Sequence, residues 1–159
     1  MNDFLSKKLI SLGILQKTKA LPLANYKPCI VFNNLIFISG QLPLVNGKIK
    51  FGGKIGKNIE GEKLKESMLI TTSNLFWNLS TTIENEKKKI KAIKFLNIKG
   101  YLNCTENFTE HPKILNETSD LIVKILGKKN GEHSRSVVGV NSLPLNSPVE
   151  IDGVFSLII

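Results

Sequence analysis

The spacing of apolar residues predicts a long helix over residues 60–86. Within this stretch, apolar side chains fall four or seven positions apart, which places them on one helical face. They are Leu64, Met68, Leu75, Leu79 and Ile83. Trp77 lies off this stripe and is expected to pack against a neighbouring element. A second helix is predicted from a cap at Thr109 to Gly127, with Pro112 in its first turn, where a missing N–H is tolerated.

Shorter apolar segments, bounded by turn residues, predict the strands. CIVF and LIFISGQLPL are separated by Asn33-Asn34, a pattern typical of a hairpin. The other expected segments are a turn and edge strand in 45–56, a strand in 91–104, a loop in 127–132, and two final strands that contain 135–140 and 149–159. This order of elements predicts an α+β sandwich, with one mixed sheet and both helices on one face.

The 159 residues are enough for one domain. We divide the chain into an N-terminal helical extension, residues 1–20, and a main domain, residues 21–159. The extension contains a short helix over residues 3–13. An acidic residue at position 3 and two lysines that interrupt the apolar run do not fit a secretory signal, and no segment is apolar enough to span a membrane, so we expect a cytoplasmic protein.

The cysteine, histidine and lysine content indicates which ligands and partners to expect. Cys29 and Cys104 are far apart in the sequence and are expected to be reduced thiols, and the two histidines and two cysteines lack a metal-binding spacing. The net charge of +9 raises the question of a nucleic-acid partner. However, the lysines are not interleaved with aromatic or arginine residues, and their densest run follows a predicted helix, where it suits the helix dipole. We therefore expect neither a metal nor a nucleic-acid partner.

Arg135 is the only arginine in the chain, which otherwise uses lysine for its positive charges. A guanidinium can hold a carboxylate with two parallel hydrogen bonds, which an ammonium cannot do. Val137, Val138 and Val140 predict that Arg135 lies on a strand that is at least half buried. Glu150 begins a second apolar strand. The two residues could form a structural ion pair, or Arg135 could bind a carboxylate ligand.

Three separated segments resemble the RidA family, also called YjgF or the reactive-intermediate deaminases. The resemblance rests on Tyr26 before the first strand, on SGQ with a following proline at residues 39–43, and on RSVV, LP and VEID near the C-terminus. It covers residues 21–159. A longer branch of the family is more similar still, because it shares the GGKIG segment at residues 52–56 and the HSRSVVGV segment at residues 133–140.

The resemblance implies a chorismate mutase-like α+β fold and a homotrimer with sites between subunits. It also implies hydrolysis, without a cofactor, of the imine forms of 2-aminoacrylate and 2-aminocrotonate to 2-keto acids and ammonia. Arg135 would then hold the substrate carboxylate, with Gln41 and Val137 also lining the substrate site. Glu150 would position the attacking water and transfer its proton, Tyr26 would close the pocket, and Ser39 would donate a hydroxyl beside the reacting nitrogen.

One departure from the family pattern leaves two functions open. Many members have a small polar or thiol residue two positions after the arginine, where this chain has Val137. The chain is therefore interpreted either as an imine deaminase or as a trimeric protein that binds small carboxylic or keto acids without catalysis. RNA cleavage or inhibition of translation is a third interpretation, suggested by older family names. The sequence offers neither paired histidines nor an aromatic platform for bases in its support.

Overall fold

The computed structural model describes residues 2–18 and 25–159, so the predicted domain boundary between residues 20 and 21 lies outside the described part. Five strands form a sheet in the order β1-β2-β7-β5-β6. Strands β5 and β6 run parallel, and the other neighbouring pairs are antiparallel. The bounds are β1 Cys29–Phe32, β2 Leu35–Gln41, β5 Ala92–Asn103, β6 Ser134–Val140 and β7 Val149–Ile158. A separate hairpin consists of β3 (Leu44–Val45) and β4 (Lys48–Ile49).

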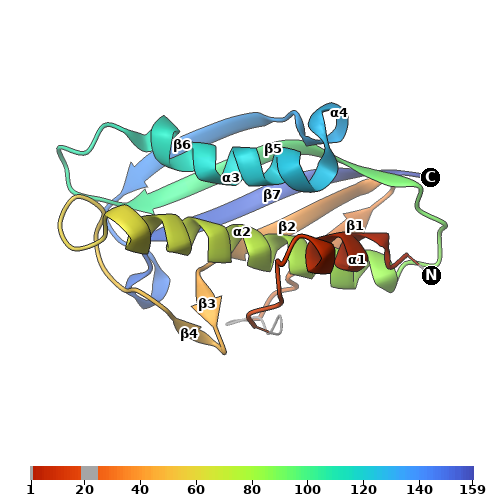
Figure 1. Cartoon of the computed structure of the whole chain (residues 1–159), viewed down its shortest axis with the longest axis horizontal. Coiled ribbons are helices and arrows are strands. Elements are labelled where there is room, and N and C mark those ends of the chain that lie inside the picture. The colour runs from red at the N-terminus through yellow and green to blue at the C-terminus, as the bar shows by residue number, and fades with distance from the viewer. Residues whose placement is uncertain (1, 19–24) are drawn as a thin grey trace.

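The two long helices cover one face of the sheet (Figure 1). They are α2 (Gly61–Glu84) and α3 (His111–Leu126), and both contribute apolar side chains to the core. The shorter elements are α1 (Phe4–Ser11), α4 (Lys128–Gly131) and the 3₁₀ turn η1 (Pro144–Asn146). The predicted α+β fold, with a mixed sheet and helices on one face, is confirmed.

The core lies between the sheet and the helices. Phe76 of α2, Phe95 of β5 and Phe155 of β7 are fully buried, and the last two rings pack edge to face at 4.2 Å. Leu5 and Leu9 of α1 are also buried in this core. The predicted contact of Trp77 with a neighbouring element is confirmed, because its indole N–H donates to the carbonyl of Ile14 at 3.1 Å. The N-terminal segment therefore packs against α2.

Apolar side chains remain exposed on the sheet face that the helices leave open. Ile30, Phe32 and Phe37 have exposed fractions of 55%, 66% and 45%. Ile30 pairs with Phe37 across β1 and β2, and Phe32 pairs with Leu35. These positions alternate with residues that face the core, so the exposed side chains share one side of the sheet. In the part of the chain that the structure describes, no helix is long and apolar enough to cross a membrane.

Three local predictions were wrong. Residues 128–131 form helix α4 instead of a loop, because Gly127 has a positive φ and its carbonyl accepts the N–H of Gly131. Helix α3 begins at His111, with Glu110 at the capping position in place of Thr109. Strand β6 is mostly exposed, although it was expected to be at least half buried, because it lies at the edge of the sheet.

Candidate functional site

The lone arginine lies on the edge strand β6 and reaches toward helix α3. Its backbone pairs with Ile98 of β5, a residue buried beneath the helices. The Arg135 guanidinium donates to Ser119 Oγ at 3.1 Å and to the carbonyl of Pro112 at 3.5 Å. Ser119 also lies 3.0 Å from His133 Nε2. Arg135 is exposed, so these contacts orient the guanidinium but leave it accessible to a ligand.

The structural ion pair between Arg135 and Glu150 is not formed, and that interpretation is wrong. Strand β5 lies between β6 and β7, and Glu150 is paired with Tyr101 of β5. Glu150 alternates with the buried Val149 and Ile151, so its side chain lies on the open face of the sheet. Arg135 contacts the helical layer on the other face. The two charged groups of one chain are therefore separated by the sheet.

Glu150 is half buried beside Gly40, which lies at a register shift within β2 where a tight turn was expected. A Cβ atom added to Gly40 would lie 1.8 Å from Glu150 Oε1, so this approach requires glycine. Among the described residues, no hydrogen bond or ion pair to the Glu150 carboxyl is found. Desolvation by burial, and then the negative charge of Asp152, raise the pKa of Glu150 above its ordinary value. This carboxyl group is suited to accept and release a proton.

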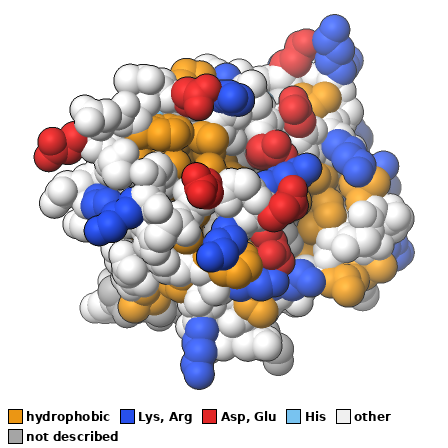
Figure 2. Space-filling view, turned by 60° about the vertical axis from the view of Figure 1, so that its left-hand side comes forward, with side chains coloured by type: hydrophobic (Ala, Val, Ile, Leu, Met, Phe, Trp, Pro, Cys, Tyr) orange, Lys and Arg blue, Asp and Glu red, His pale blue; other side chains and the backbone are white. Residues whose placement is uncertain are grey.

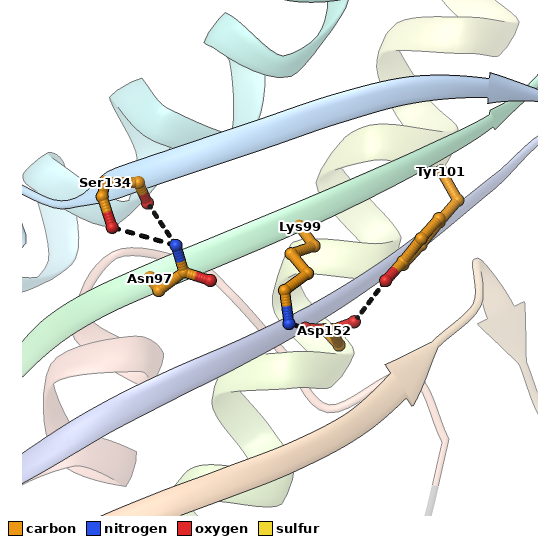
Figure 3. A network of polar contacts seen from close by, with 5 residues as sticks. All are labelled: Asn97, Lys99, Tyr101, Ser134 and Asp152. Atoms are coloured by element: carbon orange, nitrogen blue, oxygen red, sulfur yellow. Dashed lines mark hydrogen bonds and ion pairs between the residues drawn. The ribbon is translucent and has the colours of Figure 1, made fainter.

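Asp152 lies on the same open face and joins a polar network (Figure 3). Tyr101 donates its hydroxyl to Asp152 Oδ2 at 2.9 Å, and the Lys99 ammonium is 3.7 Å from Asp152 Oδ1. Burial, and then the hydrogen bond to Asp152, raise the pKa of Tyr101. The sequence prediction missed Lys99, Tyr101 and Asp152. The alternation of VEID places Asp152 on the same face as Glu150, but the neighbours on β5 depend on strand order and register.

The predicted residue Ser39 contacts the segment that follows the predicted residue Tyr26. Ser39 donates its hydroxyl to the carbonyl of Lys27 at 2.8 Å, and its N–H donates to the carbonyl of Pro28 at 2.9 Å. Tyr26, immediately before Lys27, is 45% exposed. Ser39 directly precedes Gly40, which contacts Glu150. The structure therefore places Ser39 next to the residues that contact Glu150 and Lys27, and it places Arg135 on the other side of the sheet.

The two remaining predicted substrate residues have internal contacts. Gln41 donates its amide N–H to the carbonyl of Ser39 at 2.9 Å and accepts a hydrogen bond from Asn78 of α2 at 2.6 Å. These bonds hold the irregular end of β2, which carries Ser39. Val137 lies on the same side of β6 as Arg135 and packs against the core. Their part in lining a substrate site stays a prediction.

Charged side chains of both signs are mixed on the molecular surface. Figure 2 shows basic and acidic side chains interspersed with apolar ones on the face in view. The net charge of +9 is therefore not gathered into a single basic patch on that face.

Replacing Gly40 with alanine should move the Glu150 carboxyl out of its half-buried position. The new Cβ would clash with a flexible side chain and not with backbone, so the fold should survive. Because burial is the main cause of the raised pKa, we expect the pKa of Glu150 to fall toward its ordinary value. Carbon-13 NMR titration of the Glu150 carboxyl measures this change. Gly52→Ala is the matched control, since its Cβ would approach Asn146 no closer than 3.3 Å.

Replacing Glu150 with glutamine should stabilise the protein at neutral pH. The raised pKa means that the folded state holds the Glu150 proton more tightly than the unfolded chain. The free energy of unfolding of the parent protein therefore falls as pH rises from about 4 toward 7, and glutamine removes that loss. Thermal unfolding across this range should show a growing Tm advantage for Glu150→Gln. An advantage that is constant at all pH values would contradict the raised pKa.

Comparison with known proteins gives the chain its family. Residues 6–155 match the family described as "YjgF/chorismate_mutase-like, putative endoribonuclease". A RutC family protein of Aquifex aeolicus is 30% identical over 131 residues, covering 82% of this chain and 87% of that protein. Protein TCP17 of Trypanosoma cruzi is 28% identical over 149 residues, covering 92% of this chain and 89% of that protein.

A solved structure extends the similarity to the whole chain. A protein of unknown function from Agrobacterium tumefaciens is 30% identical and superimposes with a TM-score of 0.81, covering 99% of this chain and 96% of its own. The RSVV, VEID and SGQ segments singled out in the sequence all lie within the matched region. The chain thus belongs to the YjgF/chorismate mutase-like family.

Proposed function

We propose that this protein hydrolyses small 2-imino acids, the unstable products of pyridoxal-phosphate enzymes, to 2-keto acids and ammonia. The observation that carries the proposal is the Glu150 carboxyl, half buried beside Gly40 with its pKa raised. A carboxyl group whose pKa is moved toward neutral pH is suited to general acid–base catalysis. We expect the activity in the cytoplasm, where pyridoxal-phosphate enzymes would release such products.

In the proposed reaction, the Arg135 guanidinium binds the substrate carboxylate with two parallel N–H···O bonds and so orients C2. Glu150 accepts a proton from a water molecule while the water oxygen adds to C2, and the imine π electrons move to nitrogen. Glu150 then returns this proton to the nitrogen, which gives the carbinolamine. A second proton moves from the carbinolamine hydroxyl through Glu150 to the amine, so the C=O bond forms as the C–N bond breaks and ammonia leaves. Ser39 would hydrogen-bond the reacting nitrogen, and Tyr26 would cover the pocket. The imine is already electrophilic, so no cofactor is required.

The proposed reaction requires a site between subunits. Arg135 and Glu150 lie on opposite sides of the sheet of one chain, so a small substrate cannot touch both groups of the same chain. A homotrimer would place Arg135 of one subunit near Glu150 of another. The exposed apolar residues Ile30, Phe32 and Phe37 offer a surface for such packing.

We expect light scattering to give the mass of a trimer at micromolar concentration. A single chain of 17.7 kDa is readily distinguished from three. A monomer would contradict both the assembly and the proposed site, because the arginine and the glutamate would then remain apart.

The direct test is incubation with freshly generated 2-aminoacrylate, with pyruvate and ammonia followed against the spontaneous rate. The expected result is faster release of both products in proportion to protein concentration. Release at the spontaneous rate, from protein shown to be trimeric, would overturn the deaminase proposal.

Val137 favours a second candidate function, the binding of small carboxylic or keto acids without turnover. An apolar side chain stands where many family members have a small polar or thiol group, and here it packs against the core. Calorimetry with 2-ketobutyrate, together with the assay above, distinguishes the two functions. A protein that only binds would take up the acid but would leave the hydrolysis of 2-aminoacrylate at its spontaneous rate.

The family description also names an endoribonuclease. We expect single-stranded RNA to remain intact when incubated with the same preparation.

A further inference from the structure

We propose that Cys104 and His111 form a second reactive site, at which small α,β-unsaturated carbonyl compounds add covalently to the thiol. Cys104 directly follows β5, and His111 is the first residue of α3. The Cys104 Sγ and His111 Nε2 atoms are 3.6 Å apart. This contact pairs a nucleophilic atom with a neighbouring base, which is the arrangement that activates a thiol.

The pair lines a cavity of about 440 Å³. The size suits a small molecule. Phe108 and Val140 supply apolar surface in this cavity, and Thr105 and Asn141 supply polar groups. A compound with an apolar body and one carbonyl oxygen could place its body on the apolar residues and its oxygen near the polar ones. The Phe108 ring also packs edge to face with the His111 ring at 5.2 Å, which restrains the imidazole beside the sulfur.

Gly139 packs directly against the Cys104–His111 pair. It lies on the edge strand β6 and is exposed. A Cβ atom at this position would lie 2.7 Å from Cys104 Sγ and 2.7 Å from His111 Nε2. The φ angle of Gly139 is not positive, so its backbone conformation does not require glycine. The strand therefore packs so closely on the sulfur and the imidazole that a larger side chain here would displace one of them.

Hydrogen bonds to the Asn103 side chain and to the Cys104 carbonyl hold the end of β5. The Lys54 ammonium donates to Asn103 Oδ1 at 2.8 Å and to the carbonyl of Cys104 at 3.4 Å. The Asn103 amide donates to the carbonyls of Gly53 and Ser147, both at 3.1 Å. These bonds fix the end of β5, from which the Cys104 thiol lines the cavity.

In the reaction, His111 Nε2 accepts the proton of the Cys104 thiol. The sulfur then forms a bond to one carbon of the activated double bond as the π bond breaks. The other carbon takes the proton back from the imidazolium, which leaves a thioether and a neutral His111. No oxidant, reductant or cofactor is consumed. The site uses none of the residues assigned to imine hydrolysis, so the proposal does not depend on that function.

Cys29 provides a control within the same chain. It lies on β1, and burial raises the pKa of its thiol, an effect that a hydrogen bond with Thr82 only partly offsets. A raised pKa lowers the fraction of reactive thiolate at neutral pH. Cys29 should therefore react slowly even though it is less buried than Cys104.

The test uses N-ethylmaleimide as the unsaturated carbonyl compound, with adducts located by peptide mass spectrometry. In the native protein, we expect Cys104 to be labelled before Cys29. In a Cys29→Ser background, replacing His111 with glutamine should slow labelling of Cys104 about tenfold or more, because the base is lost. Gly139→Ala should also suppress labelling. Circular dichroism and thermal unfolding establish that each variant is folded.

Two results would overturn the proposal. One is a native protein in which Cys104 stays unlabelled until the protein is denatured, since the thiol would then be closed to the cavity. The other is an equal labelling rate in the folded protein with and without His111→Gln, since the imidazole would then have no part in the reaction. The first result needs no variant, so the test holds even if a substitution impairs folding.

Discussion

Replacing Glu150 with glutamine should lower kcat/KM for 2-aminoacrylate by about 100-fold or more, because a general base typically contributes that much to a rate. Glutamine keeps the size and polarity of the side chain beside Gly40 but cannot accept the proton of the attacking water. The same substitution should stabilise the fold at neutral pH, as argued from the raised pKa of Glu150. A lower kcat/KM together with a higher stability would indicate that Glu150 serves catalysis at a cost to the stability of the fold.

Asp152→Asn is the matched control for Glu150→Gln. Asp152 is two residues away on the same face, but its carboxylate is already engaged by Tyr101 and Lys99. We expect a much smaller loss of turnover from this change. Equal losses in the two variants would indicate that negative charge on this face matters, and not proton transfer by Glu150.

Replacing Arg135 with lysine should lower kcat/KM about ten- to 100-fold while leaving the thermal midpoint nearly unchanged. Lysine keeps the charge but loses one of two charge-assisted bonds to the substrate carboxylate, together with the orientation that they impose. The effect on stability should be small, because Arg135 is exposed and bonds only to Ser119 and the Pro112 carbonyl among the described residues.

Ser119→Ala is the control for this prediction, because it removes one contact of the guanidinium and keeps the arginine. It should cost less turnover than Arg135→Lys. Intact turnover in Arg135→Lys, together with lost stability, would contradict the carboxylate-binding role.

If the site lies between subunits, refolding an equal mixture of Arg135→Lys and Glu150→Gln chains should restore about a quarter of the sites, because each site draws one residue from each of two chains.

Local sequence determined most of the secondary structure. The apolar spacing of residues 64–83 places them on one face of α2, and Gly127 ends α3 as expected, because helix periodicity and glycine at the C-terminus act over a few residues. The predictions failed where two elements meet. Residues 128–131 continue as a helix because Gly131 is buried against Val123 and bonds back to Gly127, contacts that composition does not reveal.

The residue types of the candidate site were also evident from sequence. A single arginine, and an acidic residue between buried apolar neighbours, are unusual enough to mark Arg135 and Glu150 without a structure. The SGQ turn marked Ser39 in the same way. These features are local because each depends on a residue and its immediate neighbours along the chain.

Only the tertiary structure decided how these groups are arranged. Strand order is a non-local property, and the insertion of β5 between β6 and β7 separates Arg135 from Glu150 and leaves β6 at an exposed edge. Register then sets Tyr101 opposite Glu150, and the packing of β2 on β7 brings Gly40 beneath the same carboxyl. The contact between Cys104 and His111 likewise depends on where α3 packs over the end of β5. Burial and neighbouring charge, which shift the pKa of Glu150, exist only once these distant segments are in contact.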